Sequence, residues 1–316
     1  MTGQTRPDGP AVEYPALDLP AHVSRQSVHI WSNGLRIDAD LYKPRRVLGT
    51  TQKVPAIVMS HGLGGSKLTA ERYAAELADA GMIALAFTHA GWSGSDAPAY
   101  VEHSKQDAAA GQDAEPRVRF ATEVIDPLEW VQTFRVAVDY IEGEDNVDTS
   151  RIGAWGTSFG GGVGLFNACN DDRIKALAIQ VAWVAGVPPA LVEHARRGAI
   201  DMARGVLPSV PDGSTGRLPK VPGALHFPRL RAYRPLGEIA KLEVPVLMVD
   251  AGNEDMFDIR ENAGAVRDHL ERQGRVPFLY RVIPGIDHYG IYFDGYAESA
   301  SLARSWFTTH LLKQGA

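Results

Sequence analysis

The sequence is poor in cysteine: Cys169 is the only one among 316 residues. An intramolecular disulfide and a metal site built from several thiolates are therefore excluded. The histidines and carboxylates also lack the H-E-x-x-H spacing of a helical zinc site, so we expect no bound metal. Long apolar runs are absent as well, and no stretch reaches the roughly 20 residues that a membrane-spanning helix needs.

An excess of basic residues is also missing. Lys and Arg number 32 against 38 Asp and Glu, which gives a formal net charge of −6. Such a balance provides no basic face, and it argues against nucleic acid as the main partner. The first residues lack the basic segment and apolar run of a secretory signal. We therefore expect a cytoplasmic protein, and the sequence leaves open whether its copies form a homo-oligomer.

The sequence does contain the pattern of a large α/β domain. Near the N-terminus, segments 24–31 and 35–42 alternate between polar and apolar residues. They flank Asn33-Gly34, a strong short-range signal for a hairpin turn. We expect an antiparallel hairpin at one edge of a sheet.

From residue 54 onward the strands become continuous apolar runs, which is typical of strands buried on both faces. Runs at 54–60 and 82–87 flank a helical pattern at 68–80, and this spacing predicts a parallel strand–helix–strand unit. Further strands are expected at 152–155, 174–181, 244–249 and 277–283, and further helices at 127–141, 159–169, 258–273 and 295–312. Helices should cover both faces of a mostly parallel sheet.

The alternation of strands and helices breaks between residues 182 and 236, a segment rich in proline with one helix-like stretch at 190–204. A gap this long between two strands of a sheet needs structure of its own. We interpret it as a lid over the edge where the parallel strands end. The chain then divides into an N-terminal extension, an α/β core in two pieces and the inserted lid, at residues 1–23, 24–182 with 237–316, and 183–236.

A G-x-S-x-G pattern stands between an expected strand and an expected helix. Ser158 lies at its centre, between Gly156 and Gly160. A nucleophile elbow needs this arrangement, because its sharp turn strains the serine backbone and glycine lets neighbouring backbones pass closely. The pattern spans only five residues, and glycine and serine are common, so it is weak evidence by itself. The hypothesis of a nucleophile elbow therefore depends on the strand and the helix around the pattern.

A serine hydroxyl needs an adjacent base and an acid that orients the base. In sheets of this kind the order along the chain is serine, acid, histidine. His288 follows the last expected strand in a glycine-bounded loop and is the candidate base. Three carboxylates follow the strand at 244–249, where functional side chains collect. The candidate acids are Asp250, Glu254 and Asp255.

Acyl transfer also needs backbone donors for the oxyanion. We expect the N–H of Phe159 at the start of the helix after Ser158, and a second N–H from the glycine-rich loop at 61–65. Leu63 is the preferred second donor and Gly64 the alternative. The loop lacks the G-K-[ST] end of a phosphate-binding loop, so a nucleotide site is not indicated.

Taken together, these motifs resemble the α/β-hydrolase superfamily over residues 24–312. The matching pieces are the loop at 61–65, the elbow at 156–160, the strand and turn at 246–254 and the loop at 285–288. The segments at 148–153, 172–176 and 234–236 are similar to the branch of dienelactone hydrolases and polyketide-processing acyl hydrolases. The resemblance implies an α/β-hydrolase fold with the lid inserted before the strand that carries the acid.

The resemblance also selects among the acids. In the superfamily the acid stands nine residues after a proline that precedes its strand, and this spacing from Pro245 leads to Glu254. Asp255 needs a one-residue insertion and remains the alternative. The expected function is cleavage of a carboxylic ester in a small-molecule acyl substrate, through Ser158, His288 and Glu254, without a cofactor. A thioester, lactone or amide hydrolase and an acyltransferase are alternatives with the same residues, and a non-catalytic binding protein is a third class.

Several aromatic and histidine side chains near the expected loops are candidates for the wall of a substrate pocket, although large aromatic side chains are as often part of the core. The candidates are His89, Trp92, Trp183, Phe227 and Tyr233.

Overall fold

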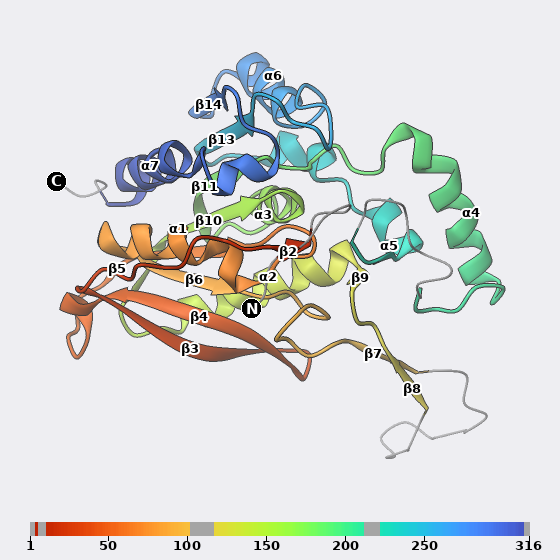
Figure 1. The fold of residues 1–316 in the computed structure, drawn as a ribbon, viewed down its shortest axis with the longest axis horizontal. Coiled ribbons are helices and arrows are strands. Elements are labelled where there is room, and N and C mark those ends of the chain that lie inside the picture. The colour runs from red at the N-terminus through yellow and green to blue at the C-terminus, as the bar shows by residue number, and fades with distance from the viewer. Residues whose placement is uncertain (1–3, 6–10, 102–116, 212–221, 313–316) are drawn as a thin grey trace.

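The computed structural model describes residues 4–5, 11–101, 117–211 and 222–312. Its centre is a sheet with the strand order β14-β13-β11-β10-β5-β6-β4-β3 (Figure 1). All neighbouring strands are parallel except at β3 and β4. The strands are β3 (Val23–Ser32), β4 (Leu35–Pro44), β5 (Val54–Ser60), β6 (Ile83–Phe87), β10 (Val147–Thr157), β11 (Ile174–Gln180), β13 (Val246–Ala251) and β14 (Phe278–Ile283).

The predicted N-terminal hairpin is confirmed. Ser32 pairs with Leu35 across a two-residue turn, and Asn33 and Gly34 both have positive φ angles, of 49° and 82°. This turn type matches the right-handed twist of the strands, which is why Asn-Gly favours it. Strand β4 pairs antiparallel with β6 and so attaches the hairpin to the parallel part of the sheet.

Two apolar layers enclose the sheet, one on each face. Helices α1 (Lys67–Asp79) and α7 (Tyr296–Phe307) bury their apolar residues in one layer. Helices α2 (Pro127–Glu142), α3 (Phe159–Ala168) and α6 (Ala263–Gln273) do so in the other. The predicted mostly parallel sheet with an antiparallel hairpin and helices on both faces is confirmed.

Helix α6 begins at Ala263, later than the expected residue 258. The reason lies in two polar side chains that bind backbone groups outside the helix. Asp258 Oδ1 accepts the N–H of Arg260 at 2.9 Å. Asn262 Oδ1 accepts the N–H groups of Val184 and Ala185 at 2.8 and 3.0 Å. These bonds stabilise a turn at 258–262 in place of a first helical turn.

The segment between β11 and β13 contains mostly short elements, with α4 and α5 beside the layered core at the right of Figure 1. They are η2 (Pro189–Leu191), α4 (Val192–Ala203), β12 (Ala224–Leu225), α5 (Phe227–Ala232) and η3 (Pro235–Lys241). Strand β12 pairs with β9 (Val124–Ile125), which precedes α2. Within this segment, residues 212–221 lie outside the described part of the chain. Its role as a lid stays a prediction.

The remaining elements are short. Strand β7 (Ala99–Val101) pairs with β8 (Val118–Phe120), and residues 102–116 between them lie outside the described part. In the N-terminal extension, of which residues 1–3 and 6–10 are not described, β1 (Gln4–Thr5) pairs with β2 (Ala11–Val12). The others are η1 (Arg45–Val47), η4 (Tyr289–Tyr292) and a π-helical turn, η5 (Thr308–Leu312). Over the described ranges, no helix combines the length and the apolar character needed to cross a bilayer.

Candidate active site

Ser158 occupies the turn between β10 and α3 in a strained backbone conformation, with φ 55° and ψ −125°. The two glycines of the pattern are required by close contacts. A Cβ on Gly156 would lie 2.3 Å from the carbonyl oxygen of Gly160. A Cβ on Gly160 would lie 2.2 Å from the carbonyl oxygen of His61. The turn therefore exists only with glycine at both positions, and it holds the serine at the end of the strand.

Ser158, His288 and Glu254 form a continuous chain of hydrogen bonds. The Ser158 Oγ lies 3.1 Å from His288 Nε2, and His288 Nδ1 lies 2.9 Å from both carboxylate oxygens of Glu254. The side chains of His288 and Glu254 are each 3% exposed. A carboxylate at Nδ1 keeps the proton on that nitrogen, so the lone pair of Nε2 faces the serine hydroxyl. This is the geometry of a serine activated by a general base.

The three candidate acids have different surroundings. Among the described residues, Asp255 Oδ1 accepts the backbone N–H of His288 at 3.4 Å and makes no contact with its imidazole. Asp250 is fully buried and accepts a hydrogen bond from Tyr280 Oη at 2.9 Å. Burial raises the pKa of Asp250 to about 7. Glu254 alone among the three contacts the imidazole, and its Oε1 also accepts the N–H of Met256 at 3.0 Å.

The glycine-rich loop after β5 packs directly on the nucleophile, because a Cβ on Gly62 would lie 2.8 Å from the Cβ of Ser158. His61 Nδ1 donates to the Gly62 carbonyl at 2.7 Å, and His61 Nε2 accepts the N–H of His89 at 3.1 Å. Burial lowers the pKa of His61 to about 4, so the ring is neutral and holds this one tautomer. In a trans peptide the carbonyl and the N–H point in opposite directions. The bond from His61 therefore fixes the direction of the N–H of Leu63.

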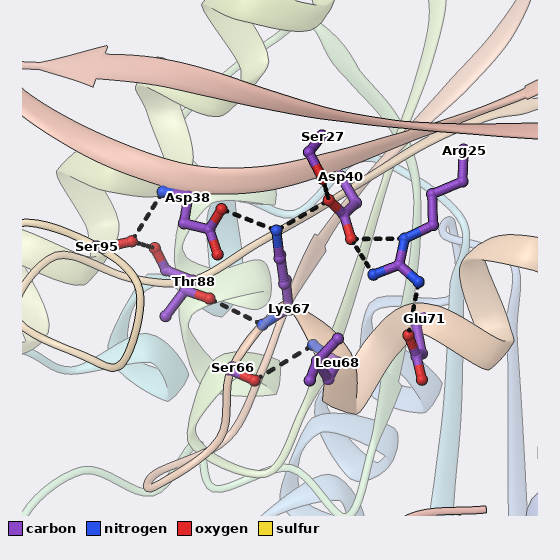
Figure 2. Close-up of polar contacts among 10 residues, drawn as sticks. All are labelled: Arg25, Ser27, Asp38, Asp40, Ser66, Lys67, Leu68, Glu71, Thr88 and Ser95. Atoms are coloured by element: carbon purple, nitrogen blue, oxygen red, sulfur yellow. Dashed lines mark hydrogen bonds and ion pairs between the residues drawn. The ribbon is translucent and has the colours of Figure 1, made fainter. Parts of the chain in front are cut away.

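A polar network holds the other end of this loop, where α1 begins (Figure 2). Lys67 Nζ donates to Asp38 Oδ1 at 2.8 Å and to Asp40 Oδ1 at 2.9 Å. The N–H of Lys67 donates to Thr88 Oγ1 at 2.9 Å. Asp40 is 1% exposed and also accepts hydrogen bonds from Arg25. The loop is thus held between the elbow on one side and the N-terminal hairpin on the other.

An apolar cavity of about 180 Å³ opens at Ser158. Of the expected wall residues, Trp183 lines it, and so does Phe159, which we expected as an oxyanion donor. Residues not predicted for this role also line it: Leu63, Pro188, Leu191, Pro222, Leu225, Leu230, Met256, Phe257 and Tyr289. Met256, Phe257 and Tyr289 follow Glu254 or His288 closely in the sequence, which is the one signal that points to them. The others come together only through the fold.

Four of the expected pocket residues lie behind the wall and do not line the cavity. His89 is fully buried, with Nε2 2.7 Å from Ser60 Oγ and its ring stacked on Trp130. Trp92 packs edge-on against the same Trp130. Phe227 is 1% exposed and Tyr233 is 2% exposed. Large aromatic side chains supply the apolar area that a core needs, and these serve to support the wall.

The described ranges give little support for a metal site or a cysteine nucleophile. There, no group of three His, Cys, Asp or Glu side chains is placed to hold a metal ion. Cys169 is buried at the end of α3, and burial raises the pKa of its thiol to about 12. A thiol of this kind is a poor nucleophile.

The sheet order, the sharp turn at Ser158 after the central strand and the position of His288 after the last strand define an α/β hydrolase. The chain belongs to the acetyl xylan esterase (AXE1) family, whose model matches residues 26–196. It is accordingly a hydrolase that acts on ester bonds. The matched residues include Ser158, whereas Glu254 and His288 lie beyond them.

The chain is also similar to individual proteins. The chain is 32% identical over 160 residues to the quorum-quenching protein AidA of Acinetobacter baumannii, a match that covers 49% of this chain and 43% of AidA. Among solved structures, it is similar to the α/β hydrolase GrgF from Penicillium sp. sh18, with a TM-score of 0.66, 16% identity and coverage of 92% and 99%. It is also similar to a dienelactone hydrolase from Anabaena variabilis, with a TM-score of 0.53, 14% identity and coverage of 92% and 99%. The predicted fold and superfamily are confirmed.

Proposed function

We propose that the chain hydrolyses a carboxylic ester through a covalent acyl-enzyme on Ser158. The observation that carries this proposal is the hydrogen-bonded chain from Ser158 Oγ through His288 to Glu254. The order of these residues along the chain and their positions at strand ends match the roles of nucleophile, base and acid. The substrate is a small molecule with an acyl group that reaches Ser158 through the apolar cavity.

The reaction has two halves. In the first, His288 Nε2 takes the proton of Ser158 as Oγ bonds to the ester carbonyl carbon, and the carbonyl oxygen becomes an oxyanion. The bond to the leaving oxygen then breaks, and that oxygen takes the proton from His288. In the second half, His288 Nε2 takes a proton from a water whose oxygen bonds to the acyl carbon. The bond from that carbon to Ser158 Oγ then breaks, His288 returns the proton to Oγ, and the carboxylic acid leaves. Glu254 orients the imidazole and stabilises its positive charge in both halves.

Two backbone N–H groups are assigned to the oxyanion, from Phe159 at the start of α3 and from Leu63. The support for Phe159 is its position directly after the nucleophile at a helix N-terminus, where N–H groups favour negative charge. The support for Leu63 is the bond from His61, which fixes the peptide before it. Donors positioned in this way contribute about 3 kcal/mol each to the transition state.

The same residues also serve thioester, lactone and amide hydrolysis or acyl transfer to an alcohol, because the fold does not select among them. Membership of an esterase family favours the carboxylic ester. A non-catalytic binding protein would have no need for a nucleophile, base and acid in hydrogen-bonded contact.

The test combines a probe with three variants. A fluorophosphonate should label Ser158, and Ser158→Ala and His288→Ala should each lower p-nitrophenyl ester turnover by about 10³-fold or more. Cys169→Ala is the control and should keep both labelling and turnover. A folded protein that is not labelled at Ser158 would contradict the proposal.

A further inference from the structure

The residues that line the apolar cavity differ in exposure, and we call its buried side the inner end and its exposed side the outer end. At the inner end, Phe159, Leu225 and Leu230 are 1%, 4% and 2% exposed. At the outer end, Met256 is 45% exposed. The outer end adjoins the base, because the ring of Phe257 lies 5.5 Å from that of His288.

This difference indicates at which end of the cavity the alcohol half and the acyl half of an ester lie. The leaving oxygen must receive a proton from His288 Nε2, so the alcohol half lies beside His288 and points toward Phe257 and the exposed Met256. The acyl half then extends the other way, into the buried inner end. The inner end starts beside the nucleophile itself, since the buried Phe159 directly follows Ser158 in the chain.

Among the described residues, the wall of the cavity carries no charged side chain of Lys, Arg, Asp or Glu. Apart from Ser158 and His288, the polar side-chain atoms of these described wall residues belong to Tyr289 and Trp183. A sugar hydroxyl or a carboxylate in the inner end would lose its water without finding partners, which is unfavourable. The volume of about 180 Å³ is comparable with the roughly 150 Å³ of an apolar cavity that binds benzene.

We propose that the acyl group of the substrate is uncharged and apolar, with about six to eight carbon atoms in a chain or one aromatic ring. This inference rests on the proposed role of Ser158 as nucleophile. The proposed acyl group distinguishes this chain from an enzyme that removes acetyl groups from a polysaccharide. An acetyl group would leave the inner end unfilled, and a polysaccharide alcohol would have to leave past the apolar Phe257 and Met256.

The unmodified protein tests the inference with two substrate series. In p-nitrophenyl esters from acetate to dodecanoate, kcat/KM should rise by about fourfold for each methylene that becomes buried. It should peak either at hexanoate, roughly 10²-fold above acetate, or at octanoate, more than about 10³-fold above acetate, and fall at dodecanoate. In a second series of hexanoate esters with alcohols from methyl to butyl, kcat/KM should change by less than about threefold, because the outer end is open. Highest kcat/KM with acetate, or an alcohol dependence as steep as the acyl dependence, would overturn the inference.

A pair of neighbouring variants refines the test. Leu191 lines the cavity and is half-buried, whereas Val192 is 50% exposed and does not line it. Leu191→Trp should lower octanoate turnover by at least about tenfold and leave acetate turnover within about twofold, because the added volume fills the cavity. Val192→Trp should leave both unchanged.

Fluorophosphonate labelling distinguishes the two proposals. A protein that is labelled at Ser158 but prefers acetate contradicts only the assignment of the acyl group. A folded protein that is neither labelled nor active on any ester contradicts the proposed function itself.

Discussion

The two walls of the site are built in different ways. One wall belongs to the α/β core and consists of turns at the ends of strands, where polar atoms bind each other at hydrogen-bond distance. The other wall belongs mainly to the segment between β11 and β13 and presents Pro188, Leu191, Pro222, Leu225 and Leu230. From this difference we infer that the core wall performs the proposed reaction and that the inserted wall selects the substrate.

The core wall tolerates little displacement. Ser158, Gly62 and Gly160 pack so closely that a single added carbon would overlap a neighbouring atom. His61 and Lys67 hold the two ends of the loop that supplies the proposed oxyanion donor. Because catalysis depends on positions within a fraction of an ångström, a wall of this kind suits the chemical step.

The inserted wall is held mainly by apolar packing. Helices α4 and α5 meet where Gly198 lies against the ring of Phe227. At the start of the segment, Asn262 binds the N–H groups of Val184 and Ala185 from outside it. Apolar surfaces of this type can be repacked with small losses in stability, so substrate preference can change without changes in the core.

The largest effect should come from the acid of the core wall. Glu254→Gln removes the charge that holds the His288 tautomer and stabilises the imidazolium, so kcat should fall by about 10² to 10⁴-fold. Asp255→Asn should lower kcat by less than about tenfold, because Asp255 contacts only the backbone of His288. Steady-state kinetics on a p-nitrophenyl ester measures both. The opposite ranking would assign the acid to Asp255, and equal small effects would remove the carboxylate from the mechanism.

The difference between the walls also explains what could be predicted from the sequence. The elbow and the hairpin turn are local, because Gly156, Gly160 and Asn33-Gly34 act on their immediate neighbours. The central strands are continuous apolar runs that only a buried parallel sheet accommodates. Position after β13 gives Asp250, Glu254 and Asp255 as candidate acids, and the resemblance selects Glu254 with Asp255 as the alternative. In the structure the Glu254 carboxylate lies against the imidazole of His288.

The inserted wall could not be predicted in the same way. Strands β9 and β12 have two residues each and pair across about 100 residues of sequence, which leaves no periodic signal. Helix η4, which belongs to the core, was not predicted either, because its four residues are too few for a periodic signal. Phe227 and Tyr233 were expected in the pocket wall, but burial places them behind it.

The next largest effect should come from the support of the core wall. Lys67→Met leaves the buried Asp40 with Arg25 and Ser27 as partners, so we expect a loss of about 2 kcal/mol in the free energy of unfolding at pH 7. Because the start of α1 would loosen, kcat should fall by roughly tenfold while KM changes little. Urea unfolding and steady-state kinetics measure these changes. Lys175→Met, an exposed position on β11, is the control and should change neither.

The pH dependence of this loss has a defined sign. Burial alone would raise the pKa of Asp40, but hydrogen bonds from Lys67, Ser27 and Arg25 outweigh it and hold the pKa below the ordinary 3.8. The folded state therefore binds fewer protons than the unfolded state as the pH falls through this range, and the stabilisation present above about pH 4 is lost below it. The gap in unfolding free energy between the wild type and Lys67→Met should narrow between pH 5 and 3. A gap that stays constant would show that lost packing, and not the ion pair, causes it.

The smallest effect should come from the inserted wall. A Cβ at Gly198 would lie 2.3 Å from Cδ2 of Phe227, so Gly198→Ala must move α4 away from α5. The cavity wall should shift by a fraction of an ångström, which should lower kcat/KM for octanoate by about three- to tenfold and leave acetate turnover unchanged. Gly143→Ala is a matched control, since it ends α2 with a negative φ of −79° and a Cβ there meets nothing closer than 3.6 Å. If Gly198→Ala instead lowered acetate and octanoate turnover equally, the inserted wall would contribute to the chemical step, and the separation between the two walls would be wrong.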